Sequence, residues 1–139
     1  MKIVHIIYSG MGGHGDVVFP LIEKDIKKNN YTIIFFGIES VFDDYKLFCN
    51  KLGIKYYYVD YKNKLSSFLF LIKFLIRVKP NIVFSHVLQI IPIKIYSLFF
   101  KSAIVTYEHS CVEVKNFKNW FIDYFQFLFS DKIVFLTKR

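Results

Sequence analysis

The residues best suited to chemistry lie in a glycine-rich loop near the start of the chain. The segment from Ser9 to Asp16 reads SGMGGHGD and holds four of the six glycines. Glycine lets another molecule approach the backbone closely, and a loop between a strand and a helix presents free N–H groups at the positive helix end. Gly12, Gly13 and His14 are therefore candidates for binding a phosphate, a sugar, or both.

Three further histidines follow or interrupt apolar runs. His109 stands between Glu108 and Ser110, directly after the run AIVTY, and His86 ends the run IVFSH. A histidine in such a place can exchange a proton with a substrate hydroxyl or phosphate, or it can be held by backbone groups in a structural role. We take His109, with its two polar neighbours, as the stronger candidate. His86 is a weaker one, and we expect His5, inside a strand pattern, to be structural.

The histidines and the two cysteines show no spacing typical of metal ligands, so we expect no metal site and no cofactor. Cys49 and Cys111 indicate free thiols in a reducing compartment, because the chain shows no secretion signal. A Cys111 nucleophile beside a histidine is an alternative that nothing in the sequence orients.

The composition is that of a single folded domain with a basic surface. The chain has 139 residues, 54% of them hydrophobic, and a net charge of +8. No apolar run reaches the roughly 18 residues of a membrane span, so we expect a cytoplasmic protein. Lysines flank aromatic-rich amphipathic stretches, which favours contact with an anionic membrane surface at its inner face over nucleic acid. A lysine-rich surface that serves only solubility is the alternative.

Short apolar runs of β type alternate with helical stretches along the whole chain. We expect Asp16 to cap the first helix, with Pro20 near its first turn, and Ser40 and Gly53 to bound the second. In the last helix, four polar residues form one face and aromatic residues cover the rest. The expected strands are 3–8, 31–36, 55–59, 82–85, 103–107 and 132–136, and the expected helices are about 16–28, 40–53, 66–78, 90–101 and 116–130.

This alternation predicts an α/β fold: a doubly wound, Rossmann-like parallel sheet of about six strands with helices on both faces. The expected strand order is 3-2-1-4-5-6. In that order the carboxyl ends of strands 1, 4 and 5 open on one edge. The glycine loop, His86 and His109 should then converge on one cleft.

The loop also matches the dinucleotide fingerprint. Gly10, Gly12 and Gly15 have the spacing GxGxxG, and Glu39 follows the second strand where a ribose-binding acid belongs. In that geometry the helix starts near the second glycine, which would place Pro20 deep inside it at a cost of about 3 kcal/mol. We therefore favour a helix that starts near Asp16, and we keep a dinucleotide site as an alternative.

Four segments in register resemble the N-terminal, acceptor-side domain of family 4 glycosyltransferases of the GT-B type. They read MKIVHIIYSGMGG at residues 1–13, KPNIVFSH at 79–86, IVTYEHS at 104–110 and SDKIVFLT at 130–137. The resemblance implies a nucleotide-sugar donor, a metal-independent mechanism and retention of the anomeric configuration. It places Gly12 and Gly13 beside the donor diphosphate and His109 in the catalytic cleft.

The resemblance covers only half of such an enzyme, because the family's second, donor-binding domain has no counterpart here. We therefore expect residues 1–139 to be an N-terminal half that acts in cell-surface polysaccharide biosynthesis on a glycan or lipid-linked acceptor. It should be inactive unless a separate donor-domain subunit completes it. The alternatives are a non-catalytic nucleotide- or dinucleotide-binding module and a membrane-docked subunit of a split enzyme.

Overall fold

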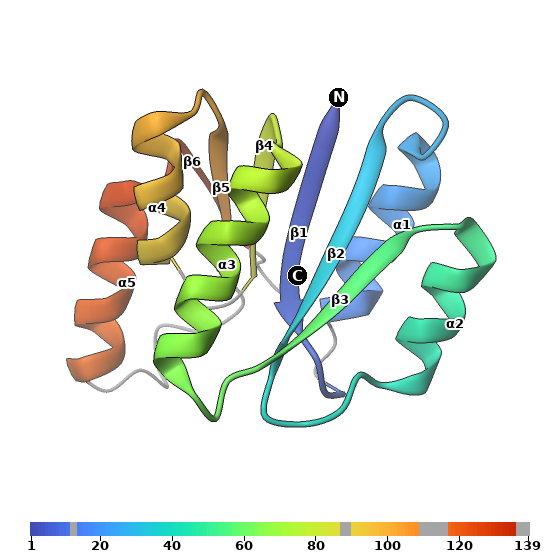
Figure 1. Cartoon of the computed structure of the whole chain (residues 1–139), viewed down its shortest axis with the longest axis horizontal. Helices are drawn as coiled ribbons and strands as arrows, with labels where there is room; N and C mark the ends of the chain where they lie inside the picture. Colours follow the sequence, from blue (N-terminus) through green and yellow to red (C-terminus); the bar gives the residue numbers. More distant parts are fainter. Residues whose placement is uncertain (12–13, 87–89, 109–116, 136–139) are drawn as a thin grey trace.

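The fold is a six-stranded, all-parallel sheet with helices on both faces, in the strand order β3-β2-β1-β4-β5-β6 (Figure 1). The computed structural model describes residues 1–11, 14–86, 90–108 and 117–135. This order and the Rossmann-like class confirm the prediction from the alternating pattern. The elements are β1 (Lys2–Tyr8), α1 (His14–Asp25), β2 (Asn30–Gly37), α2 (Asp43–Leu52), β3 (Lys55–Asp60), α3 (Lys64–Val78), β4 (Ile82–Ser85), α4 (Ile90–Phe99), β5 (Ala103–Glu108), α5 (Phe117–Phe129) and β6 (Lys132–Phe135).

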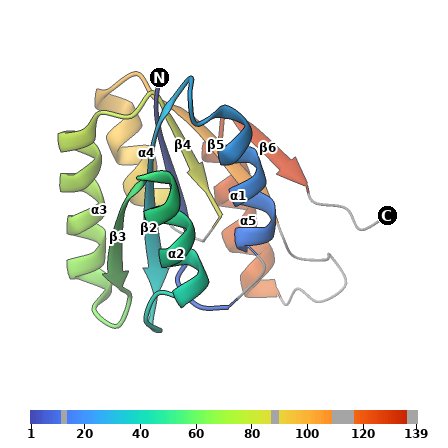
Figure 2. The ribbon, with the colours of Figure 1, turned by 90° about the vertical axis from the view of Figure 1, so that its right-hand side faces the viewer.

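Two hydrophobic clusters hold the layers together, one on each face of the sheet. On β1, Val4 and Ile6 belong to the cluster beneath α3 and α4, whereas Ile3 and Ile7 belong to the cluster beneath α1 and α2. Figure 2 shows α3 and α4 to one side of the strands and α1 to the other. A strand covered on both faces needs apolar side chains in both directions, which explains the continuous apolar runs. None of the helices in the described ranges has both the length and the apolar character needed to cross a membrane.

Helix α1 begins earlier than the sequence pattern predicted. It starts at His14, two residues before the expected cap at Asp16, and Pro20 therefore lies inside the helix. Pro20 has no N–H to offer the carbonyl of Asp16 one turn earlier. The position of Pro20 thus gives no reason to reject the dinucleotide geometry, and that part of the sequence argument was wrong.

The ends of α2 confirm one expected boundary and correct the other. Phe42, not Ser40, occupies the N-cap position, and no side chain caps the helix there. Gly53 ends the helix as predicted, in a left-handed conformation with φ of 65°. Its N–H bonds to the carbonyl of Asn50, 3.2 Å away, which satisfies an acceptor that the helix end leaves free.

Cys49 is a buried free thiol in α2 and packs in the cluster beneath α1 and α2. Burial raises its pKa to about 11, so the thiol stays protonated and unreactive at neutral pH. Cys111 lies outside the described residues.

Gly53 offers a test of the backbone conformation at the end of α2. A Cβ added there would meet nothing within 4 Å, so a substitution acts through φ alone. We expect Gly53→Ala to lower the free energy of unfolding by about 1 kcal/mol, because non-glycine residues pay that cost in the left-handed region. Gly53→Asn should cost about half as much, since asparagine tolerates this region. Equal losses in urea unfolding would contradict the left-handed assignment.

Candidate functional site

The carboxyl ends of β1, β4 and β5 lie side by side at one edge of the sheet, the lower edge in Figure 1. His86 directly follows β4, Glu108 closes β5, and His14 begins α1. The sheet thus brings the backbone of these three predicted site residues to the expected edge. Gly12, Gly13, His109 and Ser110 lie outside the described residues, as do the side chains of His14 and Glu108. Their roles stay predictions.

His86 is held in place by both its backbone and its ring. Its backbone N–H donates to the carbonyl of Ile6, 2.9 Å away. Its ring stacks on Tyr107 with the centroids 4.4 Å apart, and its Nε2 lies 3.3 Å from Nδ1 of His5. Only 5% of His86 is exposed. The imidazole therefore stands at the end of β4 as part of an aromatic row, and its candidacy for substrate binding is untested.

His5 is the buried partner in this row, as expected of a structural histidine. It stacks on Phe84 with the ring centroids 4.6 Å apart, and it is only 3% exposed. Burial lowers the pKa of His5 to about 3, because a charged imidazole would lose its hydration there. At neutral pH the ring of His5 is therefore neutral. A hydrogen bond with His86 then needs one ring to offer its N–H and the other to offer its lone pair.

A polar contact joins the loop after β1 to the loop after β2. The Ser9 hydroxyl donates to the backbone carbonyl of Glu39 over 2.7 Å, and the N–H of Phe42 donates to the carbonyl of Ser9 over 2.9 Å. Ser9 is fully buried, so its hydroxyl needs this partner. Sequence reasoning did not single out Ser9, although its place at the start of the glycine loop was a signal.

Three glycines at this edge lie close to neighbouring side chains, and none of them needs an unusual φ. A Cβ on Gly10 would overlap the Glu39 carboxylate and the Tyr8 ring, and a Cβ on Gly37 would overlap the Ser9 hydroxyl. Gly15 lies in the first turn of α1, where a Cβ would overlap aromatic rings packed against it. These contacts pack the first two strand ends and the start of α1 tightly together.

The Glu39 carboxylate lies over Gly10 and accepts a hydrogen bond from Tyr8. The pKa of Tyr8 is raised, first by loss of hydration and then by the negative charge and hydrogen bond of Glu39. A carboxylate beside a glycine loop can accept hydrogen bonds from ribose hydroxyls. Glu39 is thus placed where a nucleotide ribose could meet it.

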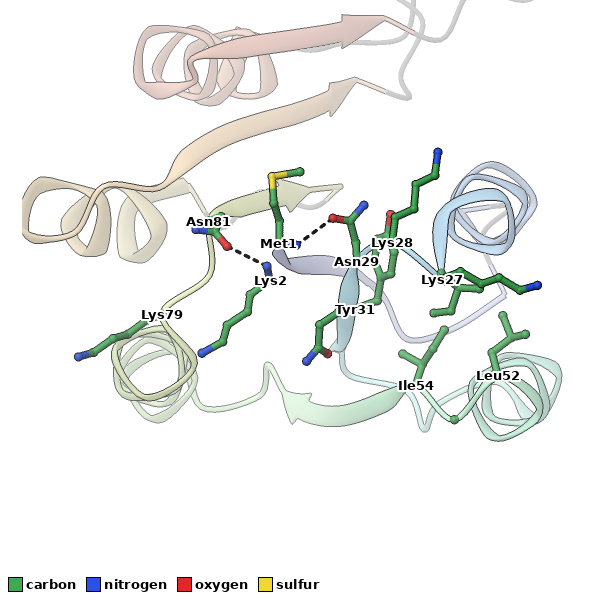
Figure 3. Close-up of a pocket in the computed structure, with 13 residues that line it drawn as sticks. Met1, Lys2, Lys27, Lys28, Asn29, Tyr31, Leu52, Ile54, Lys79 and Asn81 are labelled. Carbon is green, nitrogen blue, oxygen red and sulfur yellow. Dashed lines mark hydrogen bonds between the residues drawn. The ribbon is translucent and has the colours of Figure 1, made fainter.

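A hollow lies at the opposite, amino edge of the sheet (Figure 3). It has a volume of about 790 Å³, and Lys2, Lys27, Lys28 and Lys79 line it together with neutral residues. In Figure 3 these lysine side chains point in different directions rather than toward one point. Lys27, Lys28 and Lys79 follow the C-terminal ends of α1 and α3, where positive charge is favourable. We therefore assign this basic edge a role in complementing the helix ends.

Within the described ranges, no three histidine, cysteine or acidic residues gather closely enough to hold a metal ion. The arrangement at the carboxyl edge consists instead of backbone groups, the Glu39–Tyr8 pair and the row of buried rings. Such an edge can bind a ligand through N–H donors and a carboxylate acceptor.

Comparison with solved structures shows which proteins share this fold. HepE from Anabaena, solved with UDP, matches with a TM-score of 0.70 at 10% identity, over 96% of this chain and 37% of its own. MurG from Acinetobacter baumannii matches with a TM-score of 0.66 at 12% identity, over 99% of this chain and 41% of MurG. The lipopolysaccharide outer core galactosyltransferase WaaB matches with a TM-score of 0.69 at 20% identity, over 96% of this chain and 38% of WaaB.

At these identities the likeness shows the fold alone, and this chain spans about two fifths of the length of each of the three. No protein-family model and no curated protein sequence matches the chain. The predicted membership in family 4 and the N-terminal position therefore remain proposals.

Burial of His5 predicts a loss of stability in acid. The unfolded chain takes up a proton at His5 near pH 6.5, whereas the folded chain does so only near pH 3. The contribution of neutral His5 to the free energy of unfolding is therefore fully present above pH 6.5. It is lost as the pH falls below that value, by about 1.4 kcal/mol per pH unit. We expect His5→Phe, which preserves a ring against Phe84, to flatten the pH dependence of urea unfolding.

The control for this experiment is Phe84→Leu, which weakens the same stack without removing a titratable group. It should lower the free energy of unfolding by a similar amount at every pH. If His5→Phe retains the full acid dependence of the unmodified chain, then His5 is not the group responsible.

Proposed function

We propose that this chain is the N-terminal, acceptor-side half of a retaining family 4 glycosyltransferase of the GT-B type. The complete enzyme would transfer a sugar from a nucleotide-sugar donor to a glycan or lipid-linked acceptor in cell-surface polysaccharide biosynthesis. The observation that carries the proposal is the order β2-β1-β4-β5, which brings the glycine-loop end of β1 to the same edge as the ends of β4 and β5. The solved neighbours HepE, with UDP and with UDP-glucose, and WaaB support it by fold.

In this proposal the reaction depends on groups that stabilise charge as the donor bond breaks. The loop N–H groups of Gly12 and Gly13 would lie beside the departing diphosphate, at the positive end of α1. His109 would face the reacting sugar, with Glu108 and Ser110 beside it, and His14 and His86 would border the substrate. The donor's nucleotide would be held mainly by a second domain. Residues 1–139 alone should therefore transfer no sugar.

A dinucleotide-binding module is the second candidate, and two observations favour it. The Glu39 carboxylate lies directly over Gly10, as a ribose-binding acid would. Helix α1 also includes Gly15 in its first turn, as expected of the third glycine of a dinucleotide motif. The two candidates differ in their ligand, which makes them separable by direct binding.

Calorimetric titration with UDP-glucose and with NAD distinguishes the candidates. We expect UDP-glucose to bind this chain weakly, through its diphosphate at the glycine loop. Gly13→Val should weaken that binding about tenfold or more, because a side chain would separate the phosphate from the loop N–H groups. Glu39→Ala should leave the affinity for UDP-glucose unchanged. Tight binding of NAD that is lost in Glu39→Ala would instead establish the second candidate and overturn the first.

Sugar transfer tests the division of the enzyme into halves. The chain should show no turnover with a nucleotide sugar alone, and it should gain turnover with a polypeptide that supplies the donor domain. In the completed enzyme, His109→Ala should lower kcat by about 100-fold or more, as expected for a group acting on the reacting atoms. Lys51→Ala, on α2, is the control and should have no effect.

Turnover by the isolated chain would contradict the proposed division. A full rate for His109→Ala in the completed enzyme would contradict the assignment of His109 as a catalytic residue.

A further inference from the structure

Helix α5 presents its aromatic side to solvent and its polar side to the core. Asp123 and Gln126 are only 4% and 2% exposed. A helix on a protein surface normally buries its apolar stripe and exposes its polar one. The outer stripe of α5 has the opposite character, with exposures between 48% and 85%: Phe117, Trp120, Phe121, Tyr124 and Leu128.

Polar contacts join the end of α5 to β5. The hydroxyls of Ser130 and Thr106 lie 2.6 Å apart, and Ser130 also donates to the carbonyl of Gln126 over 2.6 Å. The carboxylate of Asp131 accepts a hydrogen bond from the N–H of Ile104 over 2.7 Å. Because Thr106 and Ile104 belong to β5, these bonds tie the end of the helix to the sheet.

Helix α4 packs against α5 (Figure 1), and it also exposes apolar side chains. Ile91, Leu98 and Phe99 of α4 are 58%, 70% and 77% exposed. Large apolar side chains exposed on two neighbouring helices of a folded domain are typical of a site of interaction.

The layer that carries this surface is also basic. Helices α3 and α4 contain no acidic residue, and the single acid of α5, Asp123, is buried. Lys94 lies on the same side of α4 as Ile91 and Leu98, at helical spacing. The opposite layer is different, because α1 and α2 together hold five acidic residues: Asp16, Glu23, Asp25, Asp43 and Asp44.

We propose that the outer stripe of α5 and the adjoining face of α4 dock onto an anionic lipid bilayer. Tryptophan and tyrosine rings suit the boundary between headgroups and acyl chains, and phenylalanine and leucine gain by burial there. Lys94 and Lys101, at the edge of this surface, would contact the lipid phosphates. A second copy of the chain is a poorer occupant, since it would bring two basic layers together.

This docking deepens the proposed function by holding the acceptor side of the enzyme at a membrane that carries lipid-linked acceptors. The docking itself needs no nucleotide sugar. Vesicle binding can therefore fail while binding of UDP-glucose succeeds, and the reverse, so the two proposals are tested separately.

Trp120 is the only tryptophan of the chain and lies on the outer stripe, so it reports directly on docking. We expect vesicles of phosphatidylglycerol and phosphatidylcholine to shift its emission to the blue, and brominated acyl chains to quench it. Vesicles of phosphatidylcholine alone should bind the chain more weakly. Flotation with anionic vesicles but no shift or quenching of Trp120 would overturn the proposed surface. A blue shift that depends on protein concentration without lipid would identify a second copy as the occupant.

Matched variants distinguish docking through this surface from nonspecific hydrophobic or electrostatic binding to vesicles. Phe121→Ser with Tyr124→Ser should weaken vesicle partitioning about tenfold or more, because two rings lose their burial. Leu47→Ser, at a 65% exposed position on α2, should leave it unchanged. Lys94→Gln and Lys101→Gln should each weaken partitioning about fivefold, and Lys51→Gln on α2 should not.

Circular dichroism confirms that each variant is folded before its vesicle partitioning is measured. Equal effects of Leu47→Ser and the paired aromatic variant would contradict the proposal.

Discussion

The central constraint in this molecule is the position of β1 between β2 and β4, hydrogen-bonded on both sides and buried on both faces. The winding of the sheet reverses at this strand, so the chain first builds outward to β3 and then returns to the other side. Only this reversal places the loop after β1 beside the ends of β4 and β5. The apolar side chains of β1 are what make the position stable, because any polar group there must find a partner inside the sheet.

His5 shows how that constraint is met. Among the titratable residues of β1, only His5 is buried. It lies against Phe84 on the neighbouring strand β4 and against His86, which directly follows β4. Burial makes it neutral, and the contact with His86 satisfies one of its nitrogens. The same contact fixes the end of β4 at the carboxyl edge. A core residue and a candidate site residue therefore depend on each other.

Much of the fold could be predicted from the sequence, because strand runs and strand order follow from apolar periodicity and short connections. Helix boundaries were less predictable. Helix α1 starts at His14 and includes Pro20. Helix α2 starts without the expected cap at Ser40. The periodicity of α5 separated a polar face from an aromatic one, but it could not say which face turns inward. The contacts that tie the end of α5 to the sheet involve Thr106 and Ile104, which are distant in the sequence.

The site itself was only partly predictable. The sequence identified the edge and the glycine loop, but the joining of Ser9 to Glu39 and the approach of Glu39 to Gly10 depend on how two loops meet. The net positive charge could be read from the composition, but the positions of the lysines in the fold could not. The lysines of the hollow lie at the amino edge, away from the proposed site, and the basic, apolar layer of α3, α4 and α5 lies to one side of the sheet.

The central claim is that the carboxyl edge, not the basic amino edge, binds the nucleotide sugar. Backbone NMR shifts measured during titration with UDP-glucose test it most directly. The account predicts shifts at Ser9 and Gly10 and at the end of β4. Shifts confined to Lys2, Lys28 and Lys79 around the opposite hollow would contradict it.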